Sequence, residues 1–373
     1  MFPLPTFCAH LVSRQMDGFF NSGSGTLFTR NLVHFSIGIY KGIYKASEDP
    51  VIIFDDFTTA NKWVDFDFKA KSSAMKMITS KDKNKALLKY IYHWLNTLPS
   101  GLVDGDHKRQ WISNYSNMQI PIPPLEIQKK IVHILDNFME LTAELTAELT
   151  ARKKQYNFYL EKLFCINETE VDRKSLGEVG EFQRGKRFVK DDMISEGIPC
   201  IHYGEMYTYY GTWANESKSF LSEELVENKN LRIAENSDVV IVAAGETIED
   251  LGKGTAWLSD EGVVIHDACF SFRSPLNPKY VAYFTRTKQF HDQIKKHISS
   301  GKISAINAKG LEKALIPVPS PEVQERVVSI LDKFDILTTS ISEGLPKEIE
   351  LRKKQYEYYR DLLLTFPNHN IES

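Results

Sequence analysis

The stretch Ile120-Pro121-Ile122-Pro123-Pro124-Leu125-Glu126-Ile127-Gln128 returns later in the chain as Ile316-Pro317-Val318-Pro319-Ser320-Pro321-Glu322-Val323-Gln324. Both copies lead to the same pentapeptide, Arg-Lys-Lys-Gln-Tyr, at residues 152–156 and 352–356. A long sequence repeat of this kind predicts tandem structural units. We therefore expect two similar units, each followed by a long helix.

The residues after each Pro-x-Pro follow a heptad pattern. In the first copy the seam positions alternate spacings of four and three, which is typical of a coiled coil, and Thr-Ala-Glu-Leu at 142–145 repeats at 146–149. The second copy carries four additional residues near Gly344-Leu345-Pro346-Lys347. Such an insertion unwinds a supercoil locally, and Gly with Pro predicts a bend or break. The predicted seam positions are Ile131, Leu135, Phe138, Thr142, Leu145, Leu149, Arg152, Tyr156, Tyr159 and Leu163, then Val327, Leu331, Phe334, Thr338, Ile341, Leu345, Ile349, Arg352, Tyr356, Tyr359 and Leu363.

The segments between the long helices have mixed α/β patterns. Short apolar runs and one alternating run predict strands, and helical spacing of apolar residues predicts helices. We expect strands at 51–54, 63–69, 239–244 and 262–265, and helices at 85–98 and 280–298. The predicted organisation is α+β, with α/β domains at 1–119 and 170–315 and long helices at 120–166 and 316–367.

The composition is that of a globular protein with ample core material: 373 residues, 42% hydrophobic and 25% charged. No apolar run approaches the roughly 18 residues of a membrane span, and the amino terminus has no export signal pattern. The 4 cysteines are widely separated, which favours reduced thiols and a cytoplasmic location. The net charge of −3 argues against a broadly basic nucleic-acid binder, so any DNA contact requires local basic patches.

Signatures of catalysis are missing from the sequence. No phosphate-binding loop and no His/Cys metal-ligand set is present. Asn277-Pro278-Lys279-Tyr280 superficially resembles the Asn-Pro-Pro-Tyr motif of adenine methyltransferases, but Lys279 replaces the second proline. We interpret this segment as a turn leading into a helix.

The repeated Ile-Pro-x-Pro-x-x-Glu-x-Gln motif, the Thr-Ala-Glu-Leu repeat and Ser175-Leu176-Gly177-Glu178-Val179 together resemble the DNA-specificity subunits of type I restriction–modification systems. The resemblance spans nearly the whole chain. It implies two target-recognition domains held apart by two long antiparallel helices with pseudo-two-fold symmetry. It further implies a non-catalytic chain that reads a bipartite target in double-stranded DNA.

The resemblance also implies partners. Two methyltransferase subunits that use S-adenosylmethionine and a restriction/translocation subunit that uses ATP and Mg would join the complex, and this chain would hold no cofactor. The alternatives are a DNA methyltransferase and a coiled-coil scaffold that does not read DNA. We also hypothesise that the helix acts as a ruler, because one Thr-Ala-Glu-Leu unit adds about 6 Å of helical rise.

Candidate DNA contacts are basic or polar side chains in predicted loops. Lys and Arg suit phosphates, and Arg, Gln, Asn or Ser can reach base edges. Each patch could equally be ordinary solvated surface. The candidates are Lys69, Lys71, Ser72, Ser73, Lys108, Arg109, Gln110, Arg184, Lys186, Arg187, Lys253, Ser299, Ser300 and Lys302. Segments 107–110 and 299–302 both precede a Pro-x-Pro, which suggests equivalent placement. The Arg-Lys-Lys-Gln-Tyr pair is compatible with helix packing, partner docking or a phosphate clamp.

Overall fold

The computed structural model describes residues 27–28, 33–37, 43–70, 74–98, 109–111, 115–116, 118–165, 171–301, 303–340 and 342–366. The chain divides into two compact units. Unit 1 comprises residues 1–147 and 347–373, and unit 2 comprises residues 148–346. Each unit therefore combines its α/β segment with parts of both long helical regions.

Unit 1 contains an antiparallel four-stranded sheet in the order β2-β5-β3-β4. Helix α2 contributes Tyr90 and Ile91 to a core that also contains Ile52 and Phe54 of the sheet. The predicted strand at 51–54 is confirmed, whereas the run at 63–69 is a strand only at its start. The elements are β1 (Leu27–Phe28), β2 (Val33–Ile37), β3 (Val51–Asp55), β4 (Asn61–Val64), β5 (Met75–Ser80), α2 (Leu88–Leu95) and β6 (Ile120–Pro121).

Unit 2 contains a five-stranded sheet in the order β10-β15-β13-β17-β8 and a four-stranded sheet in the order β11-β9-β16-β12. Its strands and helices are β7 (Arg173–Ser175), α4 (Leu176–Val179), β8 (Glu181–Arg184), η2 (Lys190–Asp192), β9 (Ile198–Ile201), α5 (Glu205–Thr208), β10 (Trp213–Ala214), β11 (Ser219–Leu221), α6 (Glu223–Asn228), β12 (Ile233–Ala234), β13 (Val239–Val242), β14 (Ala244–Gly245), η3 (Ile248–Asp250), β15 (Gly254–Trp257), β16 (Val263–Ile265), β17 (Cys269–Arg273), α7 (Pro278–Phe284), α8 (Lys288–Ile294), η4 (Lys295–His297), β18 (Ser304–Ala305), α9 (Ala308–Glu312) and β19 (Leu315–Pro317). The strands β8-β17-β13-β15 reproduce the order and antiparallel pairing of β2-β5-β3-β4.

The helix expected at 280–298 is divided into α7, α8 and η4. Thr285 and Thr287 cause the division, because their hydroxyl groups donate to the carbonyls of Ala282 and Phe284 and end the first helix. Thr287 also caps α8 by accepting the amide of Phe290. The interpretation of Asn277 to Tyr280 as a turn into a helix is confirmed, since Asn277 caps α7 and Pro278 is its first residue.

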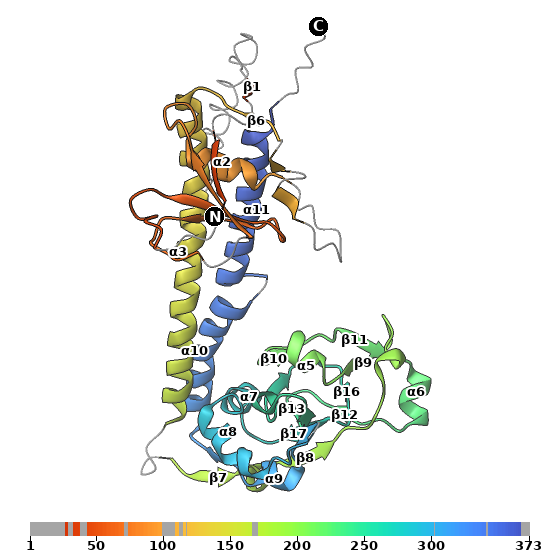
Figure 1. Cartoon of the computed structure of the whole chain (residues 1–373). Coiled ribbons are helices and arrows are strands. Elements are labelled where there is room, and N and C mark those ends of the chain that lie inside the picture. Colours follow the sequence, from red (N-terminus) through yellow and green to blue (C-terminus); the bar gives the residue numbers. More distant parts are fainter. Residues whose placement is uncertain are drawn as a thin grey trace. The chain divides into compact units, whose positions relative to one another are not determined.

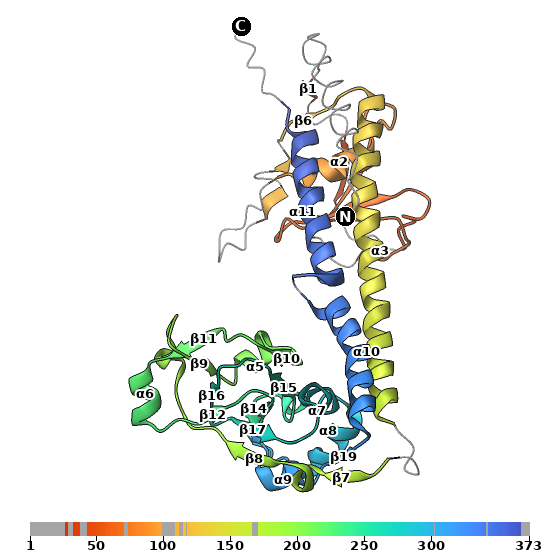
Figure 2. The same ribbon diagram turned by 180° about the vertical axis from the view of Figure 1, so that it is seen from behind.

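The first long helix, α3 (Leu125–Phe164), is continuous, as Figure 1 shows. The second long helix consists of α10 (Pro321–Thr339) and α11 (Gly344–Leu364), with the break visible from behind in Figure 2. The break confirms the prediction made from Gly344 and Pro346. Gly344 has φ of 82°, and a Cβ at this position would clash with the carbonyl oxygen of Ile336. The four-residue insertion therefore ends one helix and starts another.

The predicted heptad seam is confirmed wherever it is described, because its positions are buried or half-buried. In unit 1, Phe138 of α3 stacks on Tyr359 of α11 with ring centroids 5.3 Å apart. In unit 2, Phe334 of α10 stacks on Tyr159 of α3 at 5.4 Å. In each unit the two helices run antiparallel. The start of α3 therefore packs against the end of α11 in unit 1, and the end of α3 packs against α10, the start of the second helical region, in unit 2.

Candidate nucleic-acid interface

Several strand ends of unit 2 converge on one edge. Arg184 at the end of β8 pairs with Phe270, and Val242 at the end of β13 pairs with Cys269. The parallel strands β9 and β16 end together at Ile201 and Ile265. The loops leaving these ends form a single surface, which we call the loop edge. It comprises residues 184–189, 202–210, 243–253, 266–269 and 299–306.

All the described candidate residues of unit 2 belong to the loop edge. They come from three separate parts of the sequence, namely Arg184, Lys186 and Arg187, then Lys253, then Ser299 and Ser300. Strand pairing and the β14–β18 bridge bring these parts to the same edge. Lys302 lies outside the described residues. The fold thus assembles basic and polar groups that are far apart in sequence.

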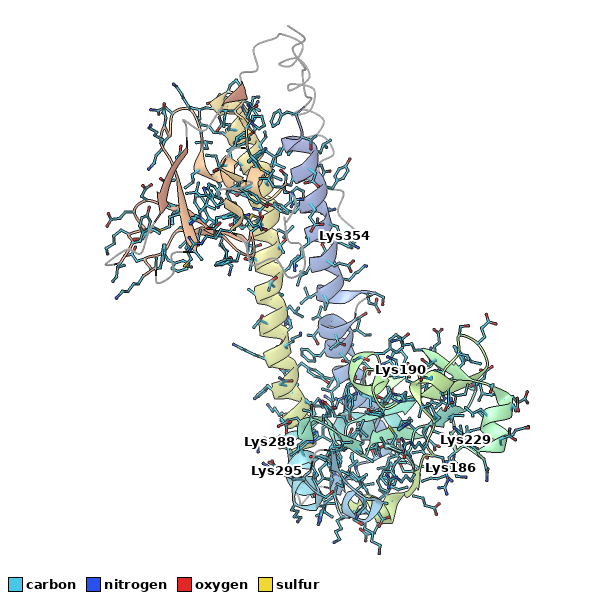
Figure 3. The ribbon with its side chains drawn as sticks, turned by 45° about the vertical axis from the view of Figure 1, so that its right-hand side comes forward. Lys186, Lys190, Lys229, Lys288, Lys295 and Lys354 are labelled. Atoms are coloured by element: carbon cyan, nitrogen blue, oxygen red, sulfur yellow. The ribbon has the colours of Figure 1, made fainter. Side chains whose placement is uncertain are left out.

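The basic side chains of the loop edge differ in how firmly they are held. The Arg184 Nε donates to the backbone oxygen of Asp267 at 2.9 Å, and Lys253 forms an ion pair with Asp250. Arg187 is exposed. Figure 3 labels Lys186 near Lys229, and the Lys186 ammonium lies 3.5 Å from the Lys229 carbonyl oxygen. Exposed arginine and lysine heads of this kind suit phosphate oxygens or guanine.

Gly185 explains how the loop after β8 comes so close to the end of β16. A Cβ on Gly185 would overlap the backbone of Ile265 and His266. The amide of Lys186 donates to the Ile265 carbonyl at 3.2 Å across this approach. A side chain at position 185 would therefore push the basic loop away from the edge.

Two histidines that sequence reasoning left aside lie inside the loop edge. The rings of His202 and His266 have centroids 4.6 Å apart, and Tyr203 and Phe188 pack beside them. Burial lowers the pKa of both histidines. The His266 Nδ1 lies 3.1 Å from the Ala268 amide nitrogen and 3.0 Å from a carboxylate oxygen of Asp267. No sequence spacing links positions 202 and 266; only the parallel pairing of β9 and β16 does.

The aromatic residues near the loop edge, among them Tyr207, Tyr209, Tyr210 and Trp213, are only partly at the surface. Tyr207 and Tyr209 are 37% and 53% exposed, whereas Tyr210 is buried. Trp213 lies instead under the ammonium of Lys279, 4.3 Å from its ring centroid. Tyr207 and Tyr209 are therefore the members available to a base or sugar.

Unit 1 has the corresponding strand ends, but its candidates are placed differently. Lys69 and Arg109 are exposed, and Arg109 lies over the ring of Phe57. Gln110 is only 5% exposed, so it is a core residue rather than an accessible reader of bases. Lys76, which is close to Lys69 in the sequence, is 1% exposed and pairs with Asp56. Lys71, Ser72, Ser73 and Lys108 lie outside the described residues.

Backbone hydrogen bonds also correct the expected equivalence of segments 107–110 and 299–302. The Gln110 amide donates to the Asp56 carbonyl, and the Ile306 amide donates to the Ala243 carbonyl, each at 2.8 Å. Asp56 and Ala243 each follow the corresponding strand, β3 or β13. Gln110 therefore corresponds to Ile306, which is also buried. Counting back from each Pro-x-Pro gives the same correspondence, because Gln110 precedes Ile120 by as many residues as Ile306 precedes Ile316, whereas segment 299–302 lies farther from its motif than segment 107–110 does.

No group of three or more His, Cys, Asp or Glu side chains within the described part of the chain could hold a metal ion. Likewise, no helix among the described residues is long and apolar enough to cross a membrane.

The type I restriction modification DNA specificity domain matches residues 30–152 and again residues 168–351. The chain belongs to this family. It is 48% identical over 345 residues to the type I restriction enzyme EcoR124I/EcoR124II specificity subunit of Escherichia coli, covering 87% of this chain and 82% of that one. A putative type I restriction enzyme specificity subunit of Haemophilus influenzae is 34% identical, with 76% and 74% covered.

Solved structures agree on the fold. The type I restriction–modification S subunit from M. genitalium matches with a TM-score of 0.51 and 17% identity, covering 92% of this chain and 96% of that one. A chain from a structure describing assembly and conformational transition of the type I R-M system matches with a TM-score of 0.56 and 17% identity, covering 88% and 84%. The chain is thus a specificity subunit, a non-catalytic DNA-recognition component, and not a methyltransferase or a scaffold that ignores DNA.

The two specificity domains share contacts as well as strand order. Gln128 accepts the Leu87 amide and donates to the Pro123 carbonyl, at 2.9 and 2.7 Å. Gln324 accepts the Asn277 amide and donates to the Pro319 carbonyl, each at 2.9 Å. The glutamine of the repeated motif therefore ties the start of a long helix to the preceding short helix in both units.

A second pair of contacts repeats at the next helical turn. The ammonium of Lys89 lies 4.3 Å from the Trp63 centroid and 3.7 Å from Asp136. Lys279 reproduces this with Trp213 at 4.3 Å and Asp332 at 2.8 Å. These matching contacts fix how each specificity domain is seated on its helices, and they leave the loops free to differ.

Proposed function

We propose that this specificity subunit reads a bipartite target in double-stranded DNA, one block by each α/β domain. The observation that carries the proposal is the repetition of strand order and of the Gln128 and Gln324 contacts in two units whose loops differ. The two domains pack on their helices in the same way but carry different loops, and such an arrangement suits the recognition of two different half-sites. The recognition domains would be residues 1–119 and 170–315, with spacer helices at 120–166 and 316–367.

The loop edge is the proposed reading surface of unit 2. Arg184, Lys186 and Arg187 would contact phosphates or guanine, and Ser299 and Ser300 would add hydrogen bonds. In unit 1 the accessible described candidates are Lys69 and Arg109. Lys71, Ser72, Ser73, Lys108, Lys253 and Lys302 remain in the proposed contact set.

The proposed complex contains two methyltransferase subunits and a restriction/translocation subunit, in the cytoplasm. S-adenosylmethionine, ATP and Mg would be held by these partners. The long helices would supply the docking surface, because both carry the same Arg-Lys-Lys-Gln-Tyr residues at matching positions. Arg152 bonds to Glu148 and Gln155 of its own helix, and Arg352 bonds to Glu348 and Gln355 in the same way. These local bonds favour a role in helix structure and partner docking over a phosphate clamp.

Methylome mapping tests the proposed function directly. Methylated adenines would be mapped in cells that express the methyltransferase with and without this chain, and then with a chain lacking residues 146–149. We expect a bipartite motif that depends on this chain, and the deletion should change only its unread spacer. A motif with one continuous block, or altered half-site bases after the deletion, would contradict the proposal.

A further inference from the structure

Three lysines beside the loop edge of unit 2 were not among the candidate DNA contacts. Lys296 lies in η4, and Lys309 and Lys313 lie one helical turn apart in and just after α9. All three are exposed. Within the described residues, none of them forms an ion pair with a carboxylate. By contrast, Lys288 and Lys253 of the same unit form ion pairs with Asp292 and Asp250.

The two segments that carry these lysines lie against each other. A Cβ at Gly310 would come within 2.9 Å of the His297 Cβ, so η4 and α9 touch at this point. His297 lies between the lysines: its pKa is lowered by burial and by the positive charges of Lys313 and Lys296. Lys313 and Lys296 thus both lie close enough to His297 for their charges to act on it. A single positive strip results, which we call the η4–α9 strip.

The η4–α9 strip continues the loop edge. The Ile306 amide, immediately before α9, donates to the Ala243 carbonyl at the end of β13. At the other side, a Cβ on Gly252 would meet the side chains of Phe290 and Ile294 of α8. Figure 3 labels Lys288 and Lys295 on this α8–η4 segment, well separated from Lys186 and Lys229. The strip therefore adjoins the part of the loop edge formed by residues 299–306.

At the corresponding sequence positions the first repeat carries residues other than the lysines of this strip. The correspondence of Gln110 with Ile306 sets an offset of 196, which is also the offset between Ile120 and Ile316. At this offset Lys309 corresponds to Ser113 and Lys313 to Asn117. The Gln128 and Gln324 contacts that seat each domain on its helices occur at corresponding positions of both repeats, whereas these lysines do not.

We propose that Lys296, Lys309 and Lys313 form a phosphate-binding strip that holds the DNA backbone beside the bases read by the loop edge of unit 2. The inference rests on the proposed function and adds an electrostatic anchor to unit 2. Unpaired ammonium groups on adjoining segments match the regular spacing of phosphate oxygens, and each contact releases condensed counterions. The strip would thus strengthen the binding of unit 2 to its half-site and increase the salt sensitivity of that binding.

The test uses the full chain in its methyltransferase complex and a duplex that carries the target mapped by methylome analysis. Lys309→Ser/Lys313→Asn introduces the residues of the first repeat. Its affinity would be measured by fluorescence anisotropy between about 50 and 200 mM salt. We expect affinity to fall roughly ten-fold at the lower salt and the log–log salt slope to shrink by about 2, near 0.9 for each lost phosphate contact. Lys296→Ser, on the other segment, should shrink the slope by about 1.

The matched control is Lys288→Ser/Lys347→Ser, which removes two lysines that already have carboxylate partners. It carries the same change in net charge and should leave the slope close to that of the wild type. If the wild-type complex shows no salt-dependent DNA binding, the proposed function fails. If the wild type binds and the Lys309/Lys313 variant keeps its affinity and slope, the strip proposal alone fails. Weaker assembly with the methyltransferase at unchanged DNA affinity would also overturn it in favour of a protein-docking role.

Discussion

Asp56 and Lys76 form a buried ion pair in unit 1, with 3.0 Å between the Asp56 Oδ2 and the Lys76 Nζ. Neither side chain is more than 1% exposed. Asp56 also accepts the Trp111 amide on its Oδ1 at 2.7 Å and the Gln110 amide on its carbonyl at 2.8 Å. The pair therefore anchors the segment that carries Arg109. In unit 2 the corresponding positions hold Ala243 and Phe270, so this anchor belongs to unit 1 alone.

Removing one member of this pair should lower the free energy of unfolding more than replacing both members. We expect Asp56→Ala to lower the free energy of unfolding by about 3–5 kcal/mol, because it leaves the Lys76 ammonium buried without its partner. Asp56→Ala/Lys76→Phe introduces the residues of unit 2 and should cost less. Urea unfolding followed by tryptophan fluorescence would measure both. Equal losses in the single and double variants would show that the charge pairing has no role.

The glutamines of the repeated motif should be equally important in both units. Gln128→Glu removes the amide group that donates to the carbonyls of Lys85 and Pro123, and it places a carboxylate beside those oxygens. We expect a loss of about 1–3 kcal/mol in the stability of unit 1, and a similar loss in unit 2 for Gln324→Glu. Hydrogen exchange resolved by peptide would assign each loss to its unit. If either variant lost stability equally in both units, Gln128 and Gln324 would not have separate roles in their own units.

The break between α10 and α11 should depend on Gly344. Gly344→Ala forces a side chain into a left-handed conformation and against the Ile336 carbonyl, which should cost about 1–3 kcal/mol. Gly211→Ala is the matched control, because nothing lies within 4 Å of its Cβ position. Thermal unfolding would compare the two variants. The expectation would be wrong if both variants melted at the wild-type temperature.

Lowering the pH should destabilise the fold of unit 2. Burial lowers the pKa of His202, His266 and His291 in the folded chain. The unfolded chain therefore binds more protons as pH falls through about 6.5, and folding becomes less favourable there. Thermal unfolding should show a falling midpoint from pH 7.5 to pH 5.5, most of all in unit 2. His202→Gln/His266→Gln should flatten this dependence, and an unchanged pH profile in that variant would exclude these two groups as its source.

Arg187 should contribute a phosphate contact from the loop edge. Arg187→Ala is expected to weaken binding to target and non-target duplexes alike and to shrink the log–log salt slope by about 1. Anisotropy titrations over a salt series would measure this, with Lys288→Ser as a control for the loss of one exposed charge. If discrimination between target and non-target DNA fell while the slope stayed constant, Arg187 would contact a base rather than a phosphate.

The sequence by itself determined the repeat, the heptad seam and the break near Gly344. These features are local or periodic, so the order of residues suffices to reveal them. Prediction from the sequence was less successful within the α/β units. The spacing of apolar residues predicts one helix up to residue 298, but the helix ends at Thr285 and Thr287. Side-chain hydrogen bonds to the backbone decided that boundary, and their geometry is not encoded in apolar spacing.

Only the tertiary structure decided which candidate residues share a surface. Strand order and pairing brought Arg184, Lys253 and Ser299 to one edge, although they lie far apart in sequence. The same pairing buried Lys76 and Gln110, which look like surface residues in the sequence, because Asp56 supplies an internal partner for the charge and for the backbone. Burial and convergence depend on contacts between segments that are distant in sequence. For that reason the sequence repeat was enough to reveal two recognition domains, whereas only the fold placed the residues of the surface that each would present to DNA.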